Sequence, residues 1–255
     1  MPLVIWQESS RQLINPISVL SIALQHQINE CQMGVLTMIK SLKSVLSATI
    51  LGLAVLGISA NSWAQTLMPV DDAAKNPDFL KFRNQLKTII ANKDAKALLA
   101  IVDKNIHMSY GDNNGIAEFK KEWKLDKPNS PLWKELNTVL SMGGQFDSQG
   151  EFMAPYVFSA WPDNADSFEN IAVVGKDVRI RSAPNLSAAV VAKSTYEILP
   201  VDAARNTLND WAAVKLKNGK TGYIARQYAR SPVDYRAFFS KKAGKWTLIT
   251  FVAGD

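Results

Sequence analysis

The segment Trp211–Ala229, WAAVKLKNGKTGYIARQYA, places the strongest constraint on the fold of this chain. Two runs of strand-forming residues flank Asn218-Gly219, a dipeptide typical of two-residue hairpin loops because their central residues adopt positive φ. Gly219 supplies that conformation, and Gly222 permits a bulge or a close approach of another segment. The second half of the chain is therefore predicted to contain an antiparallel sheet.

Further short strands are expected before this hairpin. Residues 171–184, IAVVGKDVRIRSAP, alternate between apolar and polar, and residues 188–204 contain two short β-like runs around Ser194-Thr195. Several short strands with frequent turn signals are typical of a small all-β barrel, which we expect over residues 171–230. Trp211, Val214 and Leu216 are expected to fill its interior.

The segments Asp177–Asn185, DVRIRSAPN, and Asp210–Tyr228 together resemble a bacterial SH3 domain of the SH3b type. The residues that stand at the spacing of that family are Trp211, Val214, Gly219, Gly222 and Tyr223. Arg179 stands where the family commonly has Asn, and its usual central Gly is replaced around Ser194-Thr195. The resemblance implies an SH3-like small barrel that targets or binds, and many members of the family associate with peptidoglycan or its stem peptides.

The first half of the chain reads as mostly helical after a mobile leader over residues 65–75. Helices are predicted from Asn76-Pro77, from Asp94 through Leu98 to Val102, over residues 116–123, and from Ser130-Pro131 to Gly143-Gly144. This region, extended to residues 76–165, forms the helical or α+β domain, and the polar run 163–170 is a candidate boundary.

The last segment, residues 232–255, is a second hairpin that turns near Ala243-Gly244. Its large apolar side chains need burial, and an isolated hairpin is marginal in water. We therefore expect it to pack on the 76–165 domain. The fold class predicted is α+β: a mostly helical N-terminal part completed by a C-terminal hairpin, with the SH3-like barrel between them. Helices followed by a K-x-G-K-W-x-L hairpin also resemble secreted cystatin and NTF2-like domains.

The beginning of the chain has the anatomy of a secretory signal peptide over residues 38–64. Lys40 and Lys43 precede an apolar core from Val45 to Ile58, and small residues precede the expected cut after Ala64. The core is shorter than the ~20 residues of a membrane span; an uncleaved membrane anchor is the alternative. Residues 1–37 then represent a mis-assigned start, with translation from Met38 or Met33, or a genuine extension. The location predicted is periplasmic or secreted, with membrane contact only through the signal peptide.

The composition after residue 64 restricts the chemistry. No cysteine remains, because Cys31 is the only one, and His107 is the single histidine. Disulfides and cysteine-based metal sites are therefore excluded there. The 26 basic and 21 acidic residues that remain, a net charge of about +5, permit attraction to anionic envelope polymers. They do not form the dense stripe of a nucleic-acid binder, and no cofactor-binding fingerprint is present.

Candidate catalytic groups are few, and each has a structural interpretation. His107 lies near Asp103 and Ser109 in the sequence, yet no G-x-S-x-G motif accompanies them. The run 111–115, GDNNG, lacks the spacing of a calcium loop and is predicted to be a turn. Glu118 and Glu122 share a helical face among lysines, which favours a solvated surface over a catalytic carboxylate pair. No catalytic residue and no metal site is predicted.

The candidate ligand-binding residues lie in the predicted barrel. They are Tyr196, Tyr223, Arg226 and Tyr228. Aromatic grooves of SH3-like domains bind extended peptides, although each tyrosine could equally pack against the barrel wall. A further set of arginines either forms a basic rim for carboxylates or a solvated edge: Arg179, Arg181, Arg226 and Arg230. For Trp211 the core position is favoured.

These observations predict an exported, non-enzymatic binding protein that acts at the cell envelope through its SH3b domain. The ligand predicted is peptidoglycan or an envelope protein. Two alternatives remain open. One is an accessory cell-wall enzyme whose site lies in the helical domain, with His107 as base; the other is a scaffold whose barrel only docks onto the rest of the chain.

Overall fold

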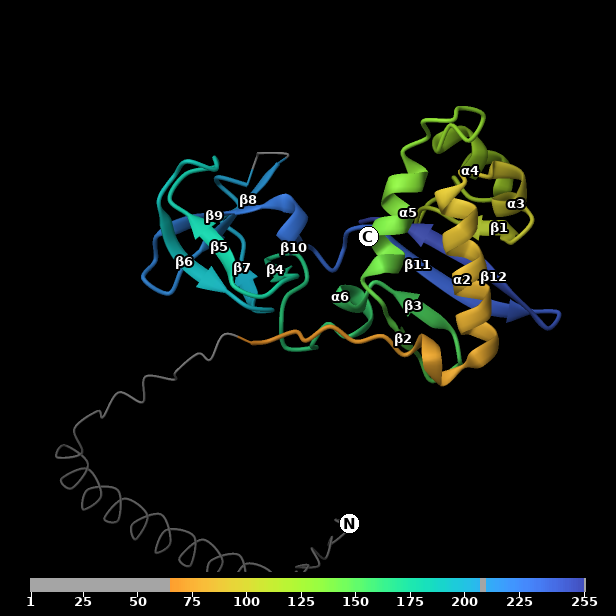
Figure 1. Cartoon of the computed structure of the whole chain (residues 1–255), viewed down its shortest axis with the longest axis horizontal. Coiled ribbons are helices and arrows are strands. Elements are labelled where there is room, and N and C mark those ends of the chain that lie inside the picture. The colour runs from red at the N-terminus through yellow and green to blue at the C-terminus, as the bar shows by residue number, and fades with distance from the viewer. Residues whose placement is uncertain (1–64, 207–209, 255) are drawn as a thin grey trace, which may run out of the picture. The chain divides into compact units, whose positions relative to one another are not determined.

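A computed structural model describes residues 65–206 and 210–254 (Figure 1). These residues form five α-helices, two short 3₁₀ helices and three separate sheets, which confirms a mixed α+β fold. The predicted signal peptide over residues 38–64 and the segment 1–37 lie outside the described residues. Within the described part, no helix is both long enough and apolar enough to cross a membrane.

Two of the helices begin at the capping residues that the sequence predicts. Helix α2 (Pro77–Ala91) follows Asn76, whose side chain accepts a hydrogen bond from the Phe79 N–H. Helix α3 (Ala95–Leu99) is capped in the same way by Asp94. The remaining helical elements are η1 (Ala73–Lys75), α4 (Ile116–Glu122), α5 (Leu132–Ser141), α6 (Tyr156–Ser159) and η2 (Arg226–Tyr228).

The second helix ends earlier than predicted, at Leu99, and Val102 begins a strand. Strand β1 (Val102–His107) pairs in parallel with the last strand of the chain, with Val102 opposite Leu248. Ile106 is fully buried. Pairing with another strand and burial of one face stabilise this segment more than a local helix would. The partner strand lies far along the sequence.

A five-stranded sheet in the order β1-β12-β11-β3-β2 forms the centre of the α+β part. Its other strands are β2 (Gln145–Phe146), β3 (Phe152–Ala154), β11 (Arg236–Lys242) and β12 (Lys245–Val252). Helices α2 and α5 lie across one face of it (Figure 1). Phe239 and Leu248 of the C-terminal hairpin share one buried cluster with Phe79 of α2 and Leu136 of α5. The hairpin therefore supplies the two strands on which the helices of the first half pack.

The strands between residues 170 and 230 form two smaller sheets, in the orders β10-β4-β7 and β6-β5-β9-β8. Their bounds are β4 (Asn170–Val173), β5 (Val178–Arg181), β6 (Val190–Ser194), β7 (Ile198–Pro200), β8 (Trp211–Lys215), β9 (Thr221–Ala225) and β10 (Ala229–Arg230). Both sheets contribute to one buried cluster that includes Ile171, Ile180 and Val214.

The closed barrel expected over residues 171–230 is not observed. No sheet of the described residues closes on itself, and an isolated bridge pairs Val201, the residue after β7, with Val214 of β8. The strands are short, and the β5–β6 pairing is irregular between Ile180 and Arg181. Such an irregularity bends a strand and interrupts the ladder within the four-stranded sheet. The two sheets pack across one shared core.

Residues 65–72, here called the N-terminal segment, are ordered, contrary to the expected mobile leader. The Leu67 N–H donates a hydrogen bond of 2.7 Å to the Tyr196 carbonyl, and the Asp72 N–H donates one of 2.8 Å to the Gly144 carbonyl. Leu67 is buried beside Tyr156 and Ile198. The segment therefore contacts both the three-stranded sheet and the α+β part, through residues that local sequence patterns do not connect.

Candidate functional site

The four-stranded sheet has one face in the core and one face exposed to solvent. Val178, Ile180 and Ile224 point into the buried cluster. Because side chains alternate along a strand, the opposite face, here called the outer face, carries Arg179, Arg181, Tyr223 and Trp211. Arg181 lies opposite Tyr223, and Tyr223 lies opposite Ala213 on the next strand. Cationic and aromatic side chains therefore lie side by side on this face.

A groove of about 350 Å³ opens on the outer face and is here called the outer groove. Its lining residues are Lys176, Asp177, Val178, Arg179, Arg181, Leu186, Trp211, Ala225, Gln227 and Tyr228. Three of these side chains are cationic and one is anionic, while Trp211 and Tyr228 provide aromatic surface. Such a lining suits an elongated ligand that carries negative charge.

The cations of this face are not neutralised by the protein itself. Arg179 lies opposite Lys193 of β6, a like-charge cross-strand pair that is unfavourable in isolation. Among the described residues, neither side chain forms an ion pair. Arg181 donates through Nη1 to the Ala188 carbonyl at 2.7 Å, which fixes its guanidinium beside the loop that follows β5. An anion bound in the outer groove would relieve this repulsion.

The four predicted ligand-binding residues occupy different positions. Tyr228 lines the outer groove and is 44% exposed. Tyr223 lies half-buried on the outer face. Arg226 donates through Nη2 to the Trp211 carbonyl at 3.4 Å and to Asn206 at 3.3 Å, so it holds the start of β8.

Tyr196 lies at the turn before β7, where it adopts φ 52° and its carbonyl accepts the Leu67 N–H. The structure thus brings Tyr228 to the groove and places Tyr196 elsewhere.

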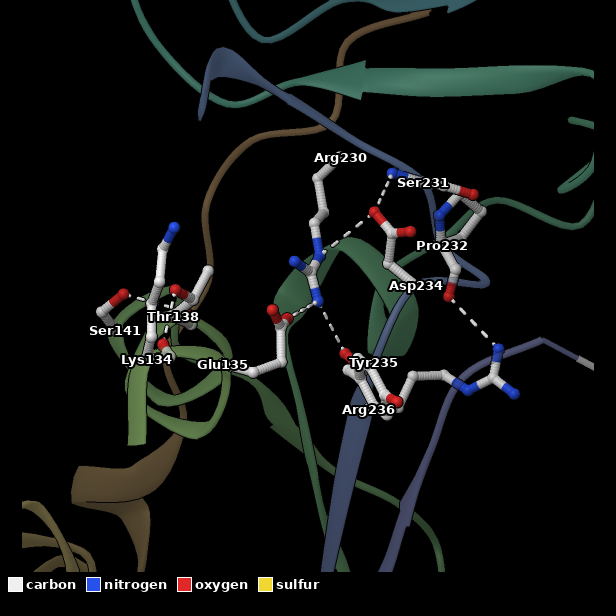
Figure 2. A network of polar contacts seen from close by, with 10 residues as sticks. All are labelled: Lys134, Glu135, Thr138, Ser141, Arg230, Ser231, Pro232, Asp234, Tyr235 and Arg236. Carbon is white, nitrogen blue, oxygen red and sulfur yellow. Dashed lines mark hydrogen bonds and ion pairs between the residues drawn. The ribbon is translucent and has the colours of Figure 1, made fainter. Parts of the chain in front are cut away.

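The predicted arginine rim divides into two groups. Arg179 and Arg181 line the outer groove, whereas Arg230 is buried and points toward the α+β part. Figure 2 shows its contacts: Nη2 donates to Glu135 at 3.0 Å and to the Tyr235 carbonyl at 2.9 Å, and Nε lies 3.6 Å from Asp234. Arg230 is therefore a structural link between β10 and α5 and not part of a basic rim.

Trp211 also differs from its expected core position. It is half-buried and lines the outer groove, because its neighbours Ala212 and Val214 occupy the core. Lys176, Leu186 and Gln227 were not among the predicted residues. The signal that could have found this face is the alternation in DVRIR, which places Arg179 and Arg181 opposite Val178 and Ile180.

The residues near His107 do not form a catalytic relay. His107 is exposed at the end of β1, and Asp103 instead lies 2.7 Å from Lys242.

Ser109 Oγ accepts the Gly111 N–H, and the Asn114 side chain accepts the Met108 N–H at 2.8 Å, so the 111–115 run is organised as a turn. Among residues 65–206 and 210–254, no group of three or more His, Cys, Asp or Glu could hold a metal ion.

A smaller cavity of about 240 Å³ lies in the α+β part. It is lined by Met108, Ser109, Asn113, Glu118, Glu122, Trp123, Tyr235 and Phe251. Burial raises the pKa of Tyr235, and the nearby carboxylates of Glu122 and Glu135 raise it further. Glu118 is already paired with Lys121 at 3.3 Å. The charged side chains that line this cavity, Glu118 and Glu122, are both acidic, whereas those of the outer groove are mostly basic.

Comparisons of the chain with protein-family models, with curated proteins and with solved structures found no match. The functional argument for this protein therefore depends on its own motif residues and on the geometry of the outer groove.

Proposed function

We propose that this chain is an exported, non-enzymatic binding protein of the cell envelope, whose outer groove holds an extended anionic ligand. The observation that carries the proposal is the combination of Lys176, Arg179 and Arg181 with Trp211 and Tyr228 along one groove. The ligand is peptidoglycan, whose stem peptides carry carboxylates, or a protein partner at the envelope.

The chemistry of the groove supports a carboxylate ligand. A guanidinium presents parallel N–H groups that match a carboxylate, and aromatic faces contact the apolar parts of the same ligand. Exposed ion pairs are individually weak, about 0.2–1 kcal/mol. A ligand that contacts the three cations and the aromatic surface together would add several such weak contributions.

The fold component of the proposal is that residues 171–230 form an SH3b-like module. We regard the two open sheets as a counterpart of the family's barrel. In support, Trp211 and Val214 lie on β8, and Gly222 and Tyr223 lie on β9, paired across one hairpin. A Cβ at Gly222 would overlap the Ile180 side chain, so the glycine serves the close packing of β9 on β5.

The export component depends on the sequence of residues 38–64, whose charged start, apolar core and small residues are those of a cleavable signal peptide. Cleavage after Ala64 would leave Gln65 as the first residue. The Gln65 carbonyl accepts a hydrogen bond of 2.7 Å from the Ile198 N–H, so the residue after this predicted cut contacts β7. The protein would then act in the periplasm or outside the cell.

Co-sedimentation of the purified protein with intact peptidoglycan sacculi, over a salt series, tests the proposal. Retention should persist at about 0.3 M salt, where the Debye length is well below 10 Å. Arg179→Gln and Tyr228→Ala should each weaken retention by about two- to fivefold. Lys217→Gln, which removes an exposed charge from the β8–β9 turn, is the matched control and should bind like the wild type.

Three outcomes would contradict the proposal. Retention that disappears equally in all three variants as salt rises would indicate unspecific charge attraction. No retention at any salt would exclude peptidoglycan and favour a protein partner or a scaffold role. His107→Ala should leave retention unchanged; a loss there would favour the enzyme alternative, with its site in the α+β part.

A further inference from the structure

Strand β6 forms one end of the four-stranded sheet (Figure 1). Within the described chain, the backbone groups of Val191, Ala192 and Lys193 have hydrogen-bond partners only toward β5. Alternate N–H and C=O groups of such a strand point away from its single neighbour and can pair with another strand. The free edge therefore offers a row of unsatisfied backbone groups.

The side chains at this edge are unusually apolar for a solvent-exposed surface. Val190 and Val191 are 45% and 47% exposed, and Leu186, in the loop that leads into β6, is 76% exposed. Natural sheets protect their edges with charges, proline or a covering segment, because an apolar edge recruits other strands. Here Lys193 is the one charged residue of β6. This combination is typical of an edge that a partner strand covers.

We propose that β6 accepts an extended acidic polypeptide segment, which adds to the sheet as an extra strand beside Val190–Ser194. The proposal rests on the proposed function, since it names a polypeptide as the ligand of the same basic face. Backbone hydrogen bonds to β6 would supply affinity, and side chains on the outer face would supply selectivity.

Charge identifies the occupant as acidic. Lys193 and Arg179 lie opposite each other on the outer face, and neither has an ion-pair partner among the described residues. An added strand lies ~4.8 Å from its neighbour, so a Glu or Asp on its outer face would stand directly beside Lys193. Its alternate apolar residues would lie on the opposite face of the sheet, beside Ala192. A second copy of this chain is a poorer occupant, because it would bring the same basic edge and a net charge of +6.

The test uses the purified full chain and a capped, alternating Glu-Val peptide as probe, with binding followed by fluorescence anisotropy. The matched Lys-Val peptide should bind at least about tenfold more weakly, because its charge is reversed. Lys193→Glu should weaken binding of the Glu-Val peptide by about three- to tenfold. Lys215→Glu, a charge reversal at another exposed lysine, on β8, should change it little.

Backbone methylation separates strand addition from charge attraction. Two further Glu-Val peptides carry N-methyl groups, one on every Glu nitrogen and the other on every Val nitrogen. Since one edge of a strand pairs with β6, one of these peptides should lose binding and the other should retain it. Equal binding of both would overturn the proposal, and so would an unchanged affinity in Lys193→Glu. Dimerisation of the chain alone that Lys193→Glu abolishes would identify a second copy as the occupant and would overturn it as well.

The peptide experiment and the sacculus experiment can fail independently, so the edge inference and the proposed function are tested separately. If the peptide does not bind while sacculi retain the protein in the manner predicted above, the edge inference is wrong and the groove proposal stands. If the peptide binds with the predicted methylation pattern while sacculi do not, the occupant is a protein segment and peptidoglycan is excluded.

Discussion

At the scale of single residues, the carboxylate of Asp103 forms an ion pair between two strands of the five-stranded sheet. It is 8% exposed on β1, lies 2.7 Å from Lys242 Nζ and accepts the Asn105 N–H at 2.7 Å. The hydrogen bond from Lys242, followed by that from Asn105, holds the pKa of Asp103 below its usual value. The folded state therefore favours the ionised carboxylate, which connects β1 to the end of β11.

The variant Asp103→Asn should lower the free energy of unfolding by roughly 1–3 kcal/mol at pH 7, measured by urea denaturation. A carboxyl whose folded pKa is depressed stabilises the protein above its unfolded pKa of about 3.9, and this contribution is lost as pH falls through the folded pKa. The difference between wild type and variant should therefore shrink as pH falls below about 3.9.

The matched control for this prediction is Asp163→Asn, at an exposed carboxylate of the 163–170 run. It should change the free energy of unfolding by less than about 0.5 kcal/mol at either pH. A difference between Asp103→Asn and wild type that stays constant down to strongly acidic pH would show that the Lys242 contact is not electrostatic in origin.

At the scale of elements, the end of α5 determines how the N-terminal segment docks. Gly143 adopts φ 72°, and a Cβ there would lie 2.6 Å from the Val70 carbonyl oxygen. A Cβ on Gly144 would collide with the Met153 carbonyl oxygen of β3. The Gly144 carbonyl also accepts the Asp72 N–H. These two glycines end a helix, as the sequence predicts, and they also admit two other backbone segments.

The variant Gly144→Ala should therefore separate β3 from the end of α5 and lower the free energy of unfolding by about 1–3 kcal/mol. Thermal unfolding measures the effect, and faster hydrogen exchange at the Asp72 amide should accompany it. Gly111→Ala is the control, because the nearest atom to its Cβ is 3.9 Å away and its φ is not positive. Equal melting temperatures for the two variants would show that the close approach at Gly144 is not required.

The elements also show which features a sequence can reveal. Asn76, Asp94 and the Asn218-Gly219 turn act within a few residues of their own position, so their patterns predicted α2, α3 and the β8–β9 hairpin. Strand β1 was missed because its partner β12 lies at the other end of the chain. The order of the N-terminal segment was missed for the same reason, since Leu67 contacts Tyr196.

The same distinction between local and long-range contacts applies to the candidate site. The basic character of Arg179 and Arg181 could be predicted from their alternation with buried residues. The position of Trp211 could also be predicted in this way, because Trp211 and Val214 are three residues apart and therefore lie on opposite faces of a strand. Arg230 was assigned to the rim because its partner Glu135 lies on a helix that no local pattern connects to β10.

At the scale of the whole molecule, elements that are far apart along the chain share one hydrophobic core. The α+β core combines residues from α2 to β3 with β11 and β12, although residues 171–230 intervene. Strands β4 and β10 pair antiparallel, with Ala172 opposite Arg230, so the intervening segment begins and ends at adjacent positions. Adjacent ends are what an inserted module requires, because its removal leaves only a short gap to close.

Replacing residues 171–230 by a short Gly/Ser linker should therefore leave the α+β core folded, with near-UV circular dichroism from Trp133 and Trp246 preserved. The deletion should still be less stable than the full chain. It leaves Glu135 without Arg230, and it removes Ile198 from the cluster around Leu67. A chain that instead stops after Ser231 lacks β11 and β12, on which Phe79 and Leu136 pack, so its α+β part should unfold and the amides of α2 and α5 should lose their protection from hydrogen exchange. If the linker variant unfolds and the truncated chain stays folded, the segment 171–230 is integral to the core and the C-terminal hairpin is not.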